Sequence, residues 1–265
     1  MVAHVSRFAR LFAVAALVSI FLTATIAAAA PHRRPVGQGL GDPSADSTVP
    51  QIAPGQKAAK VRAWIEHAIS IRLVALRGAN AAATSRSALT ANDWSLFGAQ
   101  IATDRAGLVT LANGVRTDST LTQLQGAITA MITEYRVFSV VVPQVQTTIH
   151  IDGYQATMDS LEHTEVEISA AVTTASALGD PHAVQQAYSA LVHVVQSGVS
   201  ALLSAHASVV SLTPSSFPQA AQTFQSAEAT LATVRSDVQT AHGDIDEIVQ
   251  LLRKRLGSTV FTGGT

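Results

Sequence analysis

The chain has 265 residues, of which 48% are hydrophobic, 13% are charged and none is cysteine; its formal charge is −1 at pH 7. The absence of cysteine excludes disulfide bonds, thiolate metal sites and a lipid-modified cysteine. The near balance of acidic and basic residues gives no indication of a nucleic-acid or anionic-membrane partner.

Residues 1–29 are predicted to be a secretory signal peptide. Arg7 and Arg10 precede an apolar run over 11–26, and alanines at 27–30 follow. This order is typical of a cleaved leader, so we expect a secreted or envelope-associated protein that begins near Ala30 or Pro31. The alternative is an uncleaved anchor, because the run is near the lower length limit for spanning a bilayer. We expect membrane contact only in that case.

Residues 30–55 are rich in Pro, Gly, Ser and Asp. Such a segment buries too little apolar surface to offset its ordering entropy, so we expect a disordered linker. Helical periodicity follows it and ends near Gly257, which leaves 257–265 as a predicted flexible tail.

Apolar residues spaced three or four apart predict three helices before residue 143. The first spans about 56–83. The second begins at Thr90, which can cap the free amides while Asp93 completes a capping box, and ends at Gly114. The third starts near Asp118. The positions expected to face the core are Val61, Ile65, Ile69, Leu73 and Leu76; Trp94, Phe97, Ile101, Leu108 and Leu111; and Leu121, Leu124, Ile128, Met131, Tyr135 and Phe138.

Pro143 interrupts the third helix within a segment rich in β-branched residues, 137–145. Proline removes a helical hydrogen bond and clashes with the preceding turn. A short strand is one alternative for this segment. Because helical spacing resumes after the proline, we expect a kinked or broken helix instead.

The last three helices show the most regular pattern, an alternation of three and four residues that is typical of coiled-coil seams. They are bounded by Gly179, by Asp180-Pro181 as a helix start, by Thr213-Pro214 and by Gly257. The predicted seams are Ile151, Tyr154, Met158, Leu161, Glu165, Ile168, Val172 and Ala175; Val184, Tyr188, Leu191, Val195, Gly198, Leu202, Ala205, Val209 and Leu212; and Phe224, Ala227, Leu231, Val234, Val238, Ala241, Ile245, Ile248 and Leu252.

These patterns predict an all-α fold: an elongated antiparallel helical bundle with coiled-coil-like seams. Because short loops make neighbouring helices antiparallel, we expect two three-helix units, 56–142 and 143–256, joined end to end at Pro143. The competing arrangement is a single bundle in which the first two helices pack along the last three.

The segments LTANDW, DRAGLVTLANGV, TLTQL and ITEYRVFSVVVPQV, all between residues 89 and 145, resemble secreted, Ala-rich helical proteins of actinobacteria. Tyr135, Arg136, Val137 and Phe138 form the most distinctive part. The resemblance implies export and helices, and it implies no activity and no catalytic residue.

Motif analysis predicts no catalytic residue, no cofactor and no metal site. His163 and Glu167, four residues apart on one helix face, are weak candidates for metal ligands. They lack a second motif such as H-E-x-x-H, so we expect an exposed polar patch. Tyr135, Arg136 and Pro143 are candidates for a hinge or an interaction surface, against the simpler interpretation that Tyr135 packs in the core.

We therefore expect an exported, non-enzymatic helical protein that acts as a structural or interaction module. Its partner would be another protein, an envelope polymer or a second copy of itself, and not nucleic acid. The alternative function is a helical bundle that binds a small molecule or a metal ion.

Overall fold

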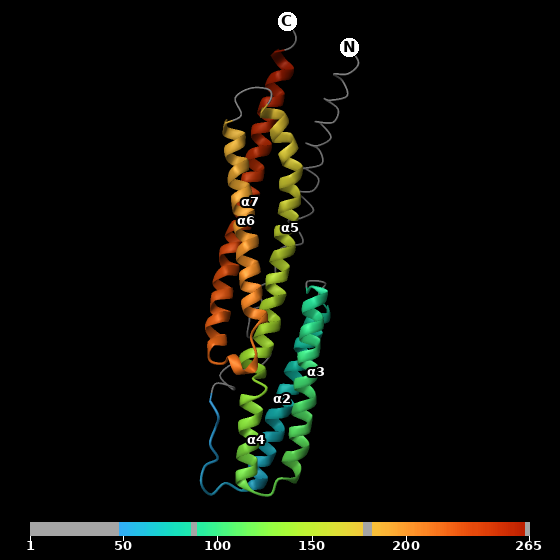
Figure 1. Cartoon of the computed structure of the whole chain (residues 1–265), viewed down its shortest axis with the longest axis vertical. Helices are drawn as coiled ribbons and strands as arrows, with labels where there is room; N and C mark the ends of the chain where they lie inside the picture. The colour runs from blue at the N-terminus through green and yellow to red at the C-terminus, as the bar shows by residue number, and fades with distance from the viewer. Residues whose placement is uncertain (1–47, 86–88, 177–181, 263–265) are drawn as a thin grey trace. The chain divides into compact units, whose positions relative to one another are not determined.

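The computed structural model describes residues 48–85, 89–176 and 182–262, so the predicted signal peptide and most of the predicted linker lie outside the described residues. All regular elements of the described chain are helical, which confirms the predicted all-α class (Figure 1). They are α2 (Ala58–Ser85), α3 (Ala91–Thr117), α4 (Leu121–Thr133), the π-helix η2 (Val137–Val141), α5 (Val142–Ser176), α6 (His182–Val210), the short 3₁₀-helix η3 (Pro214–Ser216) and α7 (Gln219–Thr262).

The described chain divides into two compact units, and the division differs from the predicted boundary at Pro143. Unit 1 comprises residues 154–202 and 232–262, whereas unit 2 comprises residues 48–153 and 203–231. The boundaries therefore fall inside α5, α6 and α7. The physical reason for the difference is that α5, α6 and α7 each run without a break through a boundary, so each helix contributes one part to each unit.

Unit 2 contains α2, α3 and α4, which lie side by side (Figure 1). Their apolar faces form a continuous core. Its fully buried large side chains include Ile65, Ile69, Leu76, Phe97, Leu108, Leu124, Met131 and Ile132. The described end of the predicted linker is held to this core, since Gln125 of α4 accepts a hydrogen bond from the Ile52 amide and donates one to the Pro50 carbonyl.

Capping residues set the starts of α3 and α4. The Thr90 hydroxyl accepts from the amide of Asp93, as predicted, and Thr120 forms a reciprocal capping box with Gln123. The predicted end of α3 at Gly114 is wrong, because the helix continues to Thr117. Arg62 of α2 explains the extension: its guanidinium donates to the carbonyls of Val115 and Asp118 and so satisfies acceptors that a helix end leaves free.

The predicted break at Pro143 lies instead at residues 134–136. Helix α4 ends at Thr133, and Arg136 adopts a left-handed backbone conformation with φ of 44°. Pro143 follows without interruption as the second residue of α5, after the π-helix that forms where the strand alternative was considered. Because proline is tolerated in the first turn of a helix, the helix breaks before the β-branched segment rather than at the proline.

Gln144 ties the start of α5 to the end of α6 within unit 2. Its side-chain amide lies 2.9, 3.1 and 3.0 Å from the carbonyl oxygens of Val209, Val210 and Leu212. These carbonyls belong to the last turn of α6 and the residues after it, where intrahelical donors are missing. A buried side chain thus supplies the C-terminal cap that the local sequence lacks.

In unit 1 the predicted seams are largely buried. Met158, Leu161 and Ile168 of α5, Leu191 and Val195 of α6, and Val234, Ala241, Ile245 and Ile248 of α7 are all at most 4% exposed. Glu165, the one acidic residue of these seams, accepts a hydrogen bond from the Tyr188 hydroxyl at 2.7 Å. The predicted stop at Gly257 is wrong, because α7 continues to Thr262.

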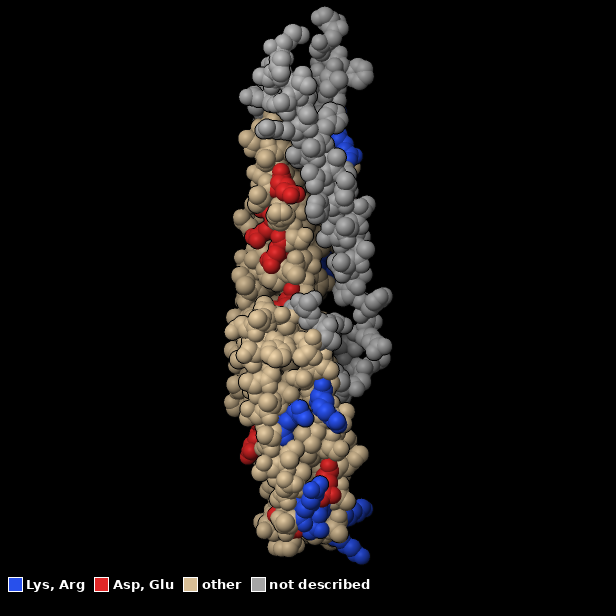
Figure 2. Space-filling view, turned by 90° about the vertical axis from the view of Figure 1, so that its right-hand side faces the viewer, with Lys and Arg blue, Asp and Glu red and all other residues tan. Residues whose placement is uncertain are grey.

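Charges are sparse on the face that Figure 2 shows, where scattered acidic and basic side chains lie among mostly uncharged atoms. Among the described helices, α6 is long and apolar enough to cross a membrane when length and composition alone are considered. The core helix of a soluble protein meets the same criteria, and the seam of α6 is buried in the two units.

Candidate functional site

The pair that the sequence singled out as weak metal ligands lies at the surface. His163 Nε2 and Glu167 Oε1 are 3.5 Å apart, and their side chains are 77% and 41% exposed. In the described part of the chain they do not join a third His, Asp or Glu in a group that could hold an ion. An exposed i, i+4 pair of this kind contributes little to stability and offers only two ligands.

The candidate hinge residues line the break before η2. The ring of half-buried Tyr135 lies against Gly107 of α3, where an added Cβ would come within 2.5 Å of the phenolic oxygen. The Arg136 guanidinium stacks over the Phe217 ring, 4.0 Å from its centroid. Tyr135 and Arg136 therefore both pack within unit 2, while Pro143, the third candidate, lies in the first turn of α5.

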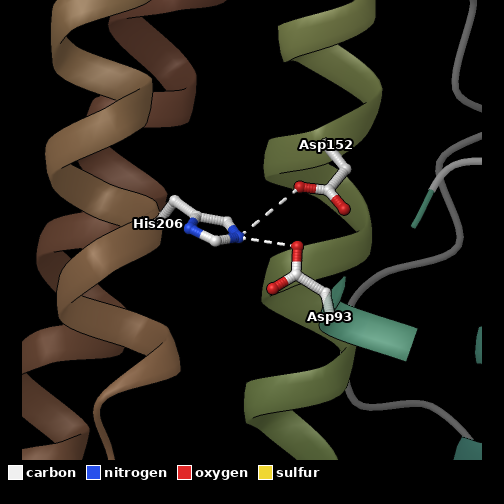
Figure 3. A group of neighbouring side chains, drawn as sticks. All are labelled: Asp93, Asp152 and His206. Carbon is white, nitrogen blue, oxygen red and sulfur yellow. Dashed lines mark hydrogen bonds and ion pairs between the residues drawn. The ribbon is translucent and has the colours of Figure 1, made fainter. Parts of the chain in front are cut away.

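A different cluster, which the sequence did not indicate, lies inside unit 2. Asp93 of α3, Asp152 of α5 and His206 of α6 come together with their ligand atoms all within 4.8 Å of one another (Figure 3). His206 Nε2 lies 2.9 Å from Asp93 Oδ2 and 3.8 Å from Asp152 Oδ1. Three helices that are distant in sequence thus contribute one side chain each.

The start of α3 positions Asp93. Asp93 is the third residue of the helix, and its carboxylate accepts a 2.6 Å hydrogen bond from the hydroxyl of the N-cap Thr90. A carboxylate in the first turn is stabilised by the positive end of the helix dipole. The backbone amide of Thr90 donates in turn to Asp152 Oδ2 at 3.1 Å. The same capping residue therefore fixes both carboxylates.

Both carboxylates are removed from solvent, whereas the histidine reaches it. The side chains of Asp93 and Asp152 are 1% and 6% exposed, and that of His206 is 29% exposed. Burial raises the pKa of Asp152 above its ordinary value; the Thr90 amide lowers it, the Asp93 charge raises it further and the His206 charge lowers it. The site thus concentrates negative charge where water does not compensate it.

One ligand atom of the site has no partner among the described residues. Asp93 Oδ1 is buried and makes no hydrogen bond, and Figure 3 shows the Asp93 carboxylate turned toward His206. Such an orphaned acceptor costs free energy unless something else satisfies it. The donor set, one imidazole nitrogen and two carboxylates, is a set that divalent metal ions use.

The sequence contained part of the signal for this site. The capping box identified Asp93, but as a helix start and not as a buried ligand. Asp152 and His206 lie 59 and 113 residues further along the chain, and no local motif links residues that far apart. Only the packing of α3 against α5 and α6 brings the three together.

Comparison with models of protein families, with curated proteins and with solved structures finds no match for this chain. The resemblance to secreted, Ala-rich actinobacterial proteins stays a prediction, and the function has to be argued from the site itself.

Proposed function

We propose that this protein binds a divalent metal ion at Asp93, Asp152 and His206, and that the ion stabilises an exported, non-enzymatic helical module. This proposal departs from the expectation of a metal-free chain and keeps the metal-binding alternative, with other ligands than His163 and Glu167. It also keeps the expected localisation and the expected lack of catalytic activity.

The observation that carries the proposal is the uncompensated charge of the site. Two carboxylates are buried together, and Asp93 Oδ1 has no partner among the described residues. A protonated His206 would offset only one of the two negative charges. A divalent cation offsets both, accepts the free Asp93 oxygen as a ligand and uses the neutral imidazole as another.

Burial supports a structural rather than a catalytic ion. Catalytic metal sites keep an open position that the substrate can reach. Here the Asp93 carboxylate is 1% exposed, and only the His206 ring has an appreciable exposed fraction. An ion held this way joins the start of α3 to α5 and α6 and needs no substrate.

Metal content of the purified mature chain tests the proposal. After exposure to one equivalent of a mixture of Mn²⁺, Co²⁺ and Zn²⁺ followed by desalting, native mass spectrometry should report one ion per chain. Asp93→Asn keeps the shape and the hydrogen bond to Thr90 but removes the charge, and it should abolish retention.

The matched control is His163→Gln, which removes an exposed histidine of the same bundle and should leave retention unchanged. Equal metal content in the wild type and Asp93→Asn would contradict the site, and so would a wild type that retains no ion. Circular dichroism of each variant verifies that the helices are intact.

A second candidate function, partner binding, rests on the outer face of α2. Trp64, Ile71 and Val74 are 46%, 43% and 53% exposed, and with Lys60 and His67 they repeat at intervals of three and four residues. This is the spacing with which a helix packs against another helix. We propose that this face binds a partner, and that a second copy of the chain is one such partner.

Sedimentation velocity over a range of concentrations tests self-association. We expect association of the wild-type chain that Trp64→Ser weakens, while Trp94→Ser, at an equally exposed tryptophan of α3, leaves it unchanged. A chain that is monomeric at every concentration would exclude a second copy as the partner.

Export has its own test: secreted material should begin near Ala30 or Pro31, and recovery only as a full-length membrane-bound chain would reject cleavage.

A further inference from the structure

We infer that the ion at Asp93, Asp152 and His206 belongs to the four-coordinate class of Zn²⁺ and Co²⁺ and not to the oxygen-seeking class of Mg²⁺ and Ca²⁺. The inference rests on the proposed function, because it names the ligand of that site. It follows from the spacing of the donor atoms, from their number and from their burial.

Spacing is the first argument. Zn²⁺ binds nitrogen and carboxylate oxygen at about 2.0–2.2 Å, so neighbouring donors of a tetrahedral site lie about 3.3–3.6 Å apart. His206 Nε2 lies 2.9 Å from Asp93 Oδ2 and 3.8 Å from Asp152 Oδ1. The two observed separations bracket the required one. The three ligand atoms all lie within 4.8 Å of one another, so side-chain movements of about an ångström would place them around one ion.

The number of donors is the second argument. Ca²⁺ takes six to eight oxygen ligands, and Mg²⁺ requires six ligands and usually keeps several waters. The cluster offers one ligand atom from each residue: one imidazole nitrogen and two carboxylate oxygens. These three donors and one further ligand would complete a tetrahedron around Zn²⁺ or Co²⁺, whereas Ca²⁺ and Mg²⁺ would lack at least three ligands.

Burial limits the supply of water molecules that could serve as the missing ligands of Ca²⁺ or Mg²⁺. With Asp93 and Asp152 at most 6% exposed in their side chains, the site offers little access for the waters that would complete an octahedron. The imidazole adds to the discrimination, because nitrogen is a poor ligand for Mg²⁺ and Ca²⁺ and a good one for Zn²⁺, Co²⁺ and their neighbours.

Metal binding would displace the proton that lies between His206 Nε2 and Asp93 Oδ2. In the hydrogen-bonded cluster one proton bridges His206 Nε2 and Asp93 Oδ2 at 2.9 Å. An ion that takes Nε2 as a ligand needs the neutral imidazole with its proton on Nδ1. The bridging proton therefore moves to Nδ1 or, where Nδ1 already carries a proton, leaves to solvent through the exposed edge of the ring. The oxidation state of the metal does not change.

Titration of the mature chain with Co²⁺, followed by visible absorption, tests the inference. Four-coordinate Co²⁺ absorbs strongly in the visible range, whereas six-coordinate Co²⁺ absorbs weakly. We expect strong bands that saturate at one equivalent, that Zn²⁺ removes and that a thousandfold excess of Mg²⁺ or Ca²⁺ leaves in place. Asp152→Asn should weaken Co²⁺ binding at least about tenfold.

Asp104→Asn is the matched control for Asp152→Asn. Asp104 is a buried carboxylate of the same unit, 4% exposed, and does not belong to the cluster, so its variant should bind Co²⁺ as the wild type does. Weak six-coordinate bands, or displacement of Co²⁺ by Ca²⁺ or Mg²⁺, would overturn the ion class and leave the proposed function standing. A chain that binds none of these ions would overturn both.

Discussion

The two units differ in what they bury. Among the described residues, the buried polar and charged side chains all belong to unit 2: Arg72, Asp93, Asp104, Gln144, Thr147, Thr148 and Asp152. Unit 1 buries aliphatic residues at regular intervals along α5, α6 and α7 instead. Helix α5 therefore contributes to a nearly pure hydrophobic core in unit 1 and to a core that also contains buried polar groups in unit 2.

This difference indicates which interactions stabilise each unit. A hydrophobic seam gains stability from apolar area removed from water, about 25 cal/mol per Å², and does not depend on one partner. A buried polar group is favourable only when its partner is correctly placed. We therefore expect unit 1 to respond to the loss of apolar character, and unit 2 to respond to the loss of individual polar partners.

Ile245→Asp should have the largest effect. Ile245 of α7 is 1% exposed, and a carboxylate at this position would be buried among aliphatic side chains, at a cost of at least about 4 kcal/mol. Native-state hydrogen exchange should show loss of protection along residues 154–202 and 232–248. Ser236→Asp, on the exposed side of the same helix, should cost no more than about 0.5 kcal/mol. Similar losses in the free energy of unfolding for the two variants would mean that the stability of unit 1 does not depend on its buried seam.

Gln144→Ala probes the polar core of unit 2 in the same way. Its side-chain amide serves three carbonyls at the end of α6, and truncation leaves buried acceptors without donors. We expect a loss of about 2–3 kcal/mol in the free energy of unfolding, measured by urea denaturation. Gln222→Ala, at an exposed position of α7, is the control and should be close to neutral. A neutral Gln144→Ala would show that solvent replaces the lost donor.

Periodicity predicted unit 1 better than unit 2, and α3 shows why. Trp94 was expected in the core and is 48% exposed, while its neighbour Asp93 is 1% exposed. The buried face of α3 follows Asp93, Phe97, Ile101, Asp104 and Leu108, with spacings of four, four, three and four. The helical period was present in the sequence, but two of the five buried positions are occupied by aspartates. A prediction based on apolar residues therefore identified Phe97, Ile101 and Leu108 but placed Trp94 on the buried face instead of Asp93.

The candidate site could not be predicted from helical periodicity for a related reason. Asp93 was recognised as a helix start because capping is local. Its neighbours Asp152 and His206 follow from which helices pack together, and residue spacing along one helix does not encode that. Likewise, Tyr135 at the break packs over Gly107 of α3, and residue spacing along one helix does not encode a contact of this kind.

Two glycine substitutions compare the packing of the units directly. A Cβ at Gly107 of α3 would lie 2.5–2.8 Å from the rigid Tyr135 ring, whereas a Cβ at Gly198 of α6 would meet the flexible end of Met158. We expect Gly107→Ala to lower the free energy of unfolding by about 1–3 kcal/mol. Gly198→Ala should change it by less than about 1 kcal/mol, because methionine repacks easily and alanine favours the helix. Thermal denaturation of both variants measures the difference, and equal losses would mean that the tyrosine ring moves as freely as the methionine.

Asp104→Asn should have the smallest effect and the most informative pH dependence. Burial raises the pKa of Asp104 above its ordinary value of 3.8, while the hydrogen bond from Gln100 opposes the shift. A carboxyl whose pKa is higher in the folded state than in the unfolded state contributes most to stability below 3.8, and this contribution is lost as the pH rises through the folded pKa. At pH 7 the charged form is therefore the costly one. Asparagine does not titrate and keeps an acceptor for Gln100, so the variant should be more stable than the wild type at pH 7 by no more than about 1 kcal/mol. The advantage should shrink as the pH falls toward 3.8, because the wild-type side chain then becomes neutral as well.

Urea denaturation of both proteins at pH 7, 5 and 4 measures the difference directly, since every other titrating group is common to the two chains and cancels. A variant less stable than the wild type at pH 7 would show that the charged hydrogen bond to Gln100 outweighs the cost of burial, and that the polar core of unit 2 stabilises the fold through its charges rather than despite them.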